Sequence, residues 1–211
     1  MKTTKKLLPA AFIAILLVAC GGNKYSSSER VEGINISDNP LVALKQVTEV
    51  GQKYQTAQAE IANQETVEPV YFEDLIELLP KSPAGWTAEK ASGETNTFGE
   101  YSISQASRSY TKRDRTIEIS IADWAYNTGL YASFLIGADF SQESSKGYNK
   151  GIKIGDVPGR EEYSYNDKSG TLSLLAEQRF YIQIKGDNIE PQELQKWWDA
   201  IDKKAMSKMG K

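Results

Sequence analysis

From Trp86 onward, several segments of this 211-residue chain have apolar residues at every second position, which is the pattern of a β-strand with one buried face. Residues 115–124 show the pattern most clearly, because Ile117, Ile119 and Ile121 alternate there with polar or small residues. A strand of this kind needs neighbouring strands and a layer that covers its apolar face. The alternation therefore restricts the chain to folds built on a covered β-sheet.

Six segments are expected to form strands. They are residues 101–111, 115–124, 148–154, 160–166, 171–176 and 179–185. Glycine, proline, asparagine and aspartate gather between several of these segments, at residues 155–159 and 166–170, as they do in tight turns. Strands joined by short turns pair antiparallel, so the sequence predicts an antiparallel sheet of about six to seven strands.

Four other segments space their apolar residues three and four apart, as helices with one buried face do. They are residues 38–63, 72–79, 129–140 and a stretch from about Pro191 toward the end of the chain. The first has a narrow apolar stripe made of Val47, Val50, Tyr54, Ala57 and Ile61. Because this stripe lasts barely two heptads, we expect it to pack on the domain; the alternative is pairing with a partner helix.

Helices before, between and after hairpins predict an α+β fold, in which helices cover an antiparallel sheet that a long N-terminal helix precedes. From Trp86 onward the order of elements is a meander, a helix, more hairpins and a terminal helix. This order resembles the PsbP-like fold of photosystem extrinsic subunits and assorted bacterial lipoproteins. The resemblance concerns element order only, so it implies a fold and assigns no functional residue.

The N-terminus is typical of an export signal. Lys2, Lys5 and Lys6 precede an apolar stretch, residues 7–18, that is shorter than the roughly 20 residues a membrane-spanning helix needs. The segment Leu17-Val18-Ala19-Cys20 follows and resembles the lipobox of bacterial lipoproteins. The resemblance implies cleavage before Cys20, a diacylglycerol on its sulfur and an acylated amine, where the alternative is an ordinary signal peptide with an incidental cysteine.

Gly21 bears on which membrane would hold the anchor. In many Gram-negative lipoproteins an aspartate at this position retains the protein at the inner membrane, so the resemblance implies the outer membrane here, or the outside of a cell that has one membrane. We therefore expect a signal peptide at residues 1–19, a flexible tether rich in glycine and serine at 20–37, a helical segment at 38–80 and an α+β domain at 81–211.

Composition excludes several chemistries. The chain has no histidine, and its single cysteine is Cys20, so zinc sites of cysteine and histidine, histidine-based nucleophile systems and disulfides within the domain are ruled out. Removing residues 1–19 takes away three lysines and changes the net charge from −3 to −6, which disfavours nucleic acid. We expect no metal and no cofactor.

Few residues stand out as a candidate site. The hairpin tip has three cations that suit an anionic group, Lys112, Arg113 and Arg115, although such tips are more often solvated turns. Trp197 and Trp198 are adjacent on a helix, so they cannot both point straight into the core. One could line a pocket or partner surface, and the alternative is a broad buried face flanked by a half-exposed indole. Tyr163 and Tyr165 share a strand face with Glu161 and form a candidate sugar or peptide platform.

These observations predict a non-enzymatic, lipid-anchored accessory or binding protein of the cell envelope. Its α+β domain would meet a protein partner or a small ligand near the membrane. The alternative is an envelope hydrolase that acts on peptidoglycan or polysaccharide through carboxylates, or through a serine and a lysine. That alternative needs a facing catalytic pair, and adjacent acids such as Glu161 and Glu162 point to opposite faces of a strand.

Overall fold

The computed structural model of the chain describes residues 40–62, 67–99 and 101–209. Within these residues nine strands form one sheet, and every strand pair is antiparallel. The strands are β1 (Thr87–Ala88), β2 (Ser92–Phe98), β3 (Tyr101–Lys112), β4 (Arg115–Asp123), β5 (Ser141–Ser144), β6 (Gly147–Ile154), β7 (Val157–Ser164), β8 (Ser169–Ala176) and β9 (Phe180–Asp187). The predicted α+β class is confirmed.

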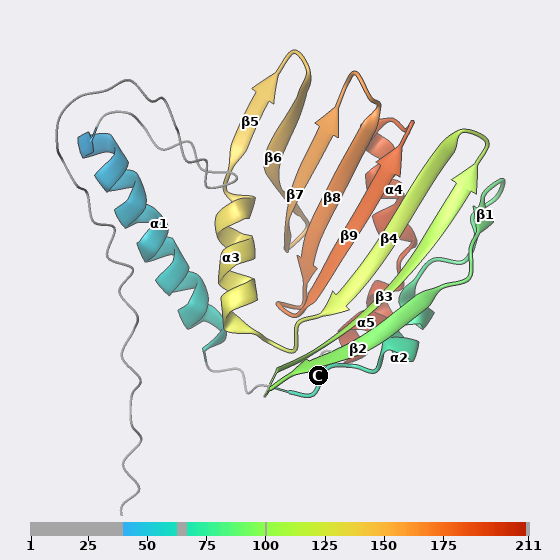
Figure 1. Ribbon diagram of the computed structural model, residues 1–211, viewed down its shortest axis with the longest axis horizontal. Coiled ribbons are helices and arrows are strands. Elements are labelled where there is room, and N and C mark those ends of the chain that lie inside the picture. Colours follow the sequence, from blue (N-terminus) through green and yellow to red (C-terminus); the bar gives the residue numbers. More distant parts are fainter. Residues whose placement is uncertain (1–39, 63–66, 100, 210–211) are drawn as a thin grey trace, which may run out of the picture. The chain divides into compact units, whose positions relative to one another are not determined.

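The sheet joins two meanders. Its order is β1-β3-β4-β9-β8-β7-β6-β5, and β2 pairs with β3 on the same edge as β1. The meander β2-β3-β4 therefore meets the meander β5 to β9 where β4 pairs with the last strand, β9 (Figure 1). The segment between the meanders holds α3 (Thr128–Ala138), which leads the chain from the middle of the sheet to its far edge.

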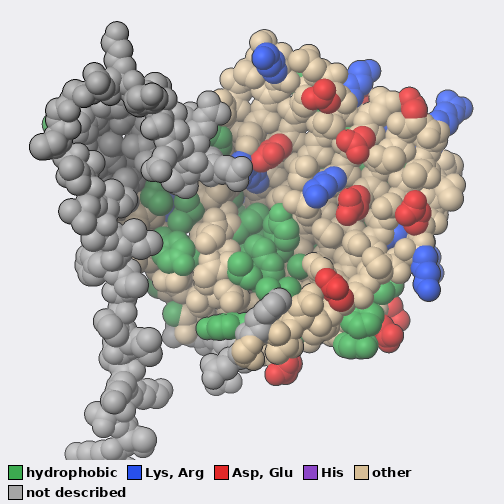
Figure 2. Space-filling view, viewed as in Figure 1, with side chains coloured by type: hydrophobic (Ala, Val, Ile, Leu, Met, Phe, Trp, Pro, Cys, Tyr) green, Lys and Arg blue, Asp and Glu red, His purple; other side chains and the backbone are tan. Residues whose placement is uncertain are grey.

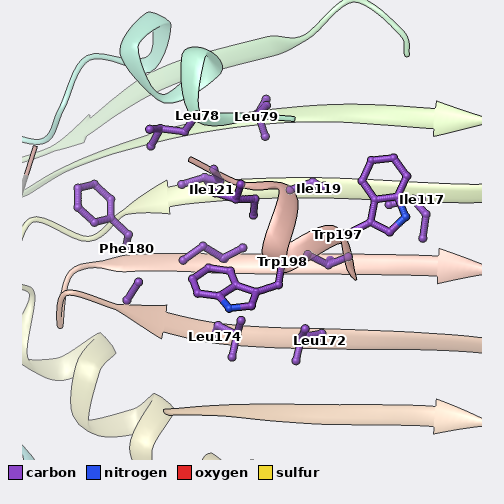
Figure 3. Packing of buried hydrophobic residues seen from close by; sticks show 14 of the residues in the cluster. Leu78, Leu79, Ile117, Ile119, Ile121, Leu172, Leu174, Phe180, Trp197 and Trp198 are labelled. Carbon is purple, nitrogen blue, oxygen red and sulfur yellow. The ribbon is translucent and has the colours of Figure 1, made fainter. Parts of the chain in front are cut away.

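Three helices cover one face of the sheet: α2 (Phe72–Leu78), α4 (Pro191–Ala200) and α5 (Lys203–Met209). The alternating apolar residues of β4, β8 and β9 pack beneath them and are buried (Figure 3). The fully buried strand residues include Ile117, Ile119, Ile121, Leu172, Leu174, Phe180, Ile182 and Ile184. This is the main core, and α2 belongs to it through Leu75 and Leu78.

The opposite face is covered only in part, by α3 and by α1 (Pro40–Ile61). A smaller apolar cluster joins Ala57 and Ile61 of α1 to Tyr131 and Ala132 of α3, and Leu175 of β8 lies under it. The stripe expected on the first helix therefore packs within the domain where it is described. Of its other members, Val50 is half-buried and Tyr54 packs against the cluster, and the side chain of Val47 lies outside the described residues.

The sheet has more strands than the six to seven that the sequence predicts. The three unpredicted strands, β1, β2 and β5, are edge strands or the shortest ones, and they bury almost nothing. Strand β2 is held instead by hydroxyl pairs across to β3: the oxygens of Thr95 and Ser104 lie 2.6 Å apart, and those of Thr97 and Ser102 lie 2.9 Å apart. An edge strand of this kind has no apolar alternation to detect.

The terminal helix also differs from the prediction, because it is broken in two. Ile201 has extended backbone angles, with φ −72° and ψ 140°, and ends α4. Asp202 then caps α5 by accepting a hydrogen bond from the backbone N–H of Ala205 at 2.9 Å. The break allows Met206 of α5 to be buried in the main core.

The contact between α1 and α3 includes Tyr131, whose phenol keeps its proton to a higher pH than an exposed tyrosine does. The hydroxyl of Tyr131 donates a hydrogen bond to the Glu60 carboxylate at 2.8 Å. Burial, and then the neighbouring Glu60, raise the pKa of Tyr131 to about 12. Ionising this phenol would place two negative charges side by side.

Alkaline pH is therefore expected to weaken this contact. A raised folded-state pKa contributes stability that is complete below the ordinary tyrosine value of about 10 and is lost as the pH rises through about 12. We expect Tyr131→Phe to lose less stability than the wild type between about pH 10 and about pH 12, measured by urea unfolding. The exposed Tyr165→Phe serves as the control. Equal losses in the wild type and Tyr131→Phe would contradict the prediction.

Candidate binding face of the sheet

The face of the sheet opposite α4 is lined by polar side chains that lie in register across six strands. One row runs through Ser109 of β3, Glu118 of β4, Lys185 of β9, Thr171 of β8, Glu162 of β7 and Asn149 of β6. A parallel row runs through Ser107, Ser120, Gln183, Ser173, Arg160 and Gly151. Side chains alternate along a strand, so these positions face away from the main core. We call this surface the open face.

Part of the open face forms a shallow trough with a volume of about 740 Å³. Hydroxyl and amide side chains dominate its lining, and charges of both signs lie among them. The charged residues are Glu89, Glu118, Glu162, Asp187, Lys146 and Lys185. Figure 2 shows this face with basic and acidic side chains interspersed and with hydrophobic side chains gathered beside α3. The trough therefore offers many hydrogen-bonding groups and no block of a single charge.

A second hollow of about 310 Å³ continues the trough toward α3. Glu162 and Thr171 line both hollows, so the two adjoin. The second hollow is also lined by Ser133, Phe134, Gly137, Arg160, Ser173, Tyr181 and Gln183. It combines side chains of β7, β8 and β9 with side chains of α3. We call it the α3 hollow.

A glycine allows α3 to lie close to the sheet at this point. A Cβ atom on Gly151 of β6 would lie 1.6 Å from the carbonyl oxygen of Ala138, the last residue of α3. The backbone N–H of Gly151 also donates a hydrogen bond to the carbonyl oxygen of Phe140 at 2.9 Å. Any side chain at residue 151 would push the end of α3 away from β6 and change the wall of the α3 hollow.

The aromatic wall of the α3 hollow is part of a stacked group. Trp124 stacks on Tyr181 with ring centroids 4.8 Å apart and planes 11° apart. Phe134 of α3 meets Tyr181 edge-on, with centroids 5.8 Å apart. The Tyr181 hydroxyl accepts a hydrogen bond from Gln183 at 3.0 Å and lies 3.3 Å from the hydroxyl of Ser173. The aromatic rings and the polar floor are therefore held together as one unit.

A polar network forms the other side of the α3 hollow. The Nε of Arg160 donates to the side-chain oxygen of Asn149 at 2.7 Å, and its Nη2 lies 2.8 Å from a carboxylate oxygen of Glu162. The amide of Asn149 donates to the same carboxylate oxygen at 2.9 Å. Arg160 is thus fixed in one orientation, and its charge is balanced by Glu162.

Glu118 and Glu162, two acidic residues of the open face, are too far apart to act as a glycosidase pair. Glu118 on β4 and Glu162 on β7 lie in one row with two strands between them. Three strand spacings of about 4.8 Å separate their backbones by roughly 14 Å. Catalytic carboxyl pairs of glycosidases lie about 5–9.5 Å apart.

In the part of the chain that the structure describes, no group of three or more acidic, histidine or cysteine side chains is arranged to hold a metal ion. None of the helices described there is long and apolar enough to cross a membrane. Cys20 and the predicted signal peptide and tether lie outside the described residues.

Trp197 and Trp198 are both buried, so neither indole is available to a ligand or partner on the surface of the domain. They are 4% and 3% exposed. Trp197 packs against Tyr110 and Trp86, with ring centroids 4.5 Å and 5.1 Å away. The expectation that these two adjacent residues cannot both point into the core is wrong here, because the buried face of α4 is broad enough to include Leu194 and both indoles.

The hairpin-tip cations do not form one cluster. Lys112 and Arg115 both lie over the ring of Trp86, at 6.0 Å and 5.3 Å from its centroid, and Arg115 is paired with Glu193 of α4. Only Arg113, at the turn itself, is exposed. Two of the three predicted anion-binding side chains are thus engaged on the covered face.

The predicted tyrosine platform exists as a group of three rings. Tyr163 and Tyr165 lie 5.8 Å apart between centroids, and Tyr148 lies 6.0 Å from each. However, Tyr163 is buried, and its hydroxyl donates to the carbonyl oxygen of Ile189 at 2.7 Å, whereas Tyr165 is exposed. Glu161 accepts a hydrogen bond from Tyr148. The Tyr163 ring lies on the helix-covered side of the sheet, beside Leu194 of α4, although Tyr148 and Tyr163 also border the trough.

Sequence reasoning missed the residues of the α3 hollow. Arg160, Thr171, Ser173 and Gln183 are the polar partners of buried residues in amphipathic strands, which is the only signal they give. The chain matches no protein-family model, no curated protein and no solved structure. The resemblances to the lipobox and to the PsbP-like fold therefore stay predictions from the sequence.

Proposed function

We propose that this chain is a non-enzymatic, lipid-anchored protein of the cell envelope that binds a ligand on the open face of its sheet. The observation that supports this function is the asymmetry of the sheet. Its apolar face is covered by α2, α4 and α5, whereas much of its other face is a trough of hydroxyl, amide and interspersed charged groups. A wide concave polar surface beside partly buried aromatic rings suits recognition.

The location rests on the N-terminal sequence. Acylated Cys20 would tether the domain to a membrane, with Gly21 directing it to the outer membrane where the cell has two. An anchored domain samples only what lies near that membrane. The ligand is then an envelope component, either a protein partner or a smaller molecule.

Photocrosslinking in living cells tests this function with a matched pair of lysines. Lys185 lies exposed on the open face, and Lys204 lies exposed on α5, on the covered side. Each is replaced, in separate full-length variants, by the photoreactive residue benzoylphenylalanine. We expect irradiation to give a covalent adduct from position 185 and none from position 204, analysed by gel mobility and mass spectrometry.

The anchor has its own control in the same cells. With Cys20→Ala, the domain should leave the membrane fraction, and the adduct from position 185 should decline because the ligand is no longer nearby. A Cys20→Ala variant that is processed normally and stays membrane-bound would refute the anchor. Adducts that form equally from positions 185 and 204, or from neither, would refute the open face as the binding surface.

A further inference from the structure

We infer that the ligand of the open face is a neutral glycan, with one sugar ring seated in the α3 hollow and the rest of the chain in the adjoining trough. This inference rests on the proposed function and names the ligand class for the same face. Three observations support it: an aromatic wall, hydrogen-bonding side chains that are held in place, and a surface without excess positive charge.

The aromatic wall suits the apolar side of a pyranose ring. Phe134 projects from α3 and Tyr181 from β9, and both line the hollow. A sugar ring has one patch of C–H groups among its hydroxyls, and a C–H patch gains dispersion and electrostatic energy against an aromatic face. The hollow of about 310 Å³ is at the lower end of the range of about 300–1,000 Å³ found for small-molecule sites.

The polar groups suit neighbouring hydroxyls. Arg160 and Gln183 are planar groups with paired hydrogen-bonding atoms, and the hydroxyl of Ser173 lies between their strands on β8. Arg160 uses Nε for Asn149 and Nη2 for Glu162, and no described residue accepts a hydrogen bond from its Nη1. This nitrogen lies beside Gly137, since a Cβ atom on that glycine would lie 3.7 Å from it. A donor held in place in this way loses little entropy on binding.

Charge distinguishes a neutral glycan from a phosphate-bearing ligand. An anion site needs excess positive charge, but the only cation of the α3 hollow, Arg160, is paired with Glu162 at 2.8 Å. In the trough, the two lysines are outnumbered by four acidic residues. A phosphate or an acidic headgroup would therefore meet net repulsion across the face, whereas uncharged hydroxyls would not.

The extent of the trough suits a chain of sugars. Its lining reaches from Ser109 on β3 to Asn149 on β6, which is five strand spacings or roughly 24 Å. Because the α3 hollow adjoins the trough at Glu162 and Thr171, one bound glycan chain can occupy both the trough and the hollow. The ligand is thus an extended oligosaccharide or polysaccharide segment.

Binding measured on the full-length protein in detergent micelles tests the inference. The probes are chitotetraose, cellotetraose and, as the anion, inorganic phosphate. We expect at least one tetrasaccharide to release heat in calorimetry and to change tryptophan fluorescence, because Trp124 stacks on Tyr181 of the hollow. We expect phosphate to do neither. Gln183→Ala should weaken tetrasaccharide affinity about tenfold, by removing a hydrogen-bonding partner.

Gln105→Ala is the matched control. Gln105 is a glutamine on the open-face side of β3 that lines neither hollow and donates to Glu94 at 2.6 Å. This variant should bind as the wild type does, and thermal melting should show both variants folded. Equal losses in the two variants, binding of phosphate through Arg160, or no binding of either tetrasaccharide would overturn the glycan inference. A protein adduct from position 185 alongside no tetrasaccharide binding would overturn the glycan and leave the proposed function standing, whereas absence of both refutes both.

Discussion

Replacing Arg179 with methionine is expected to lower the free energy of unfolding by about 3–5 kcal/mol. Arg179 holds Asp123 through two hydrogen bonds of 2.7 Å, from Nε and Nη2 to the two carboxylate oxygens. Asp123 is fully buried and the Arg179 side chain is 6% exposed. Removing one partner leaves a buried charge without compensation, which costs more than the intact pair contributes.

The pair also joins four segments of the chain. Arg179 donates to the carbonyl oxygens of Glu68 at 3.1 Å and Met209 at 3.4 Å, while Asp123 accepts from the backbone N–H groups of Val70 and Ala125 at 2.7 Å and 2.8 Å. The segment before α2, the end of β4, the β8–β9 turn and the end of α5 therefore depend on it. Although burial opposes the charge, the hydrogen bonds to Asp123 raise the pKa of Arg179, so the loss should not vary with pH near neutrality.

Urea unfolding compares this variant with two others. Arg113→Met changes an exposed arginine and should shift stability by no more than about 0.5 kcal/mol. Arg179→Met combined with Asp123→Asn should be less destabilised than the sum of the single changes, because no unpaired charge is left behind. Equal unfolding midpoints for Arg179→Met and Arg113→Met would show that the buried pair contributes little.

How far the sequence predicts the fold depends on how much each element buries. Strand β4 was predicted because Ile117, Ile119 and Ile121 are fully buried and alternate with polar residues. Strand β2 has no such pattern, since its pairing depends on hydroxyls such as those of Thr95 and Thr97. A periodicity argument detects burial, so it misses strands that are held by polar contacts at an edge.

The candidate site was less predictable than the fold, for a topological reason. The alternation in β4 and β9 already puts Glu118 and Gln183 on the polar sides of their strands. Nothing local indicates that β4 and β9 are neighbours, because α3 and four strands separate them in the chain. The approach of Phe134 to Tyr181 depends on the same long-range arrangement. Residues that gather only through strand order cannot be grouped from spacing alone.

Trp197→Ala and Trp198→Ala are each expected to cost about 3–5 kcal/mol of stability. The sequence argument, in which one indole is half-exposed, predicts instead that one of the two changes is mild. Figure 3 shows the two rings over different parts of the sheet, Trp197 beside Ile117 and Trp198 near Leu174. Because α4 lies against the sheet, and α2 and α5 contribute to the same core, both indoles are enclosed, and either truncation leaves a large cavity.

The neighbouring Lys196→Ala separates loss of packing from any effect on the helix itself. Lys196 is exposed on α4, and alanine is the better helix former, so this variant should stay within about 0.5 kcal/mol of the wild type. Urea unfolding of the three variants shows whether each indole is buried or lies at a surface. A small change in either tryptophan variant would mean that its indole lies at a surface, and would restore that residue as a candidate contact. Two large losses would place both tryptophans in the core and leave recognition to the open face.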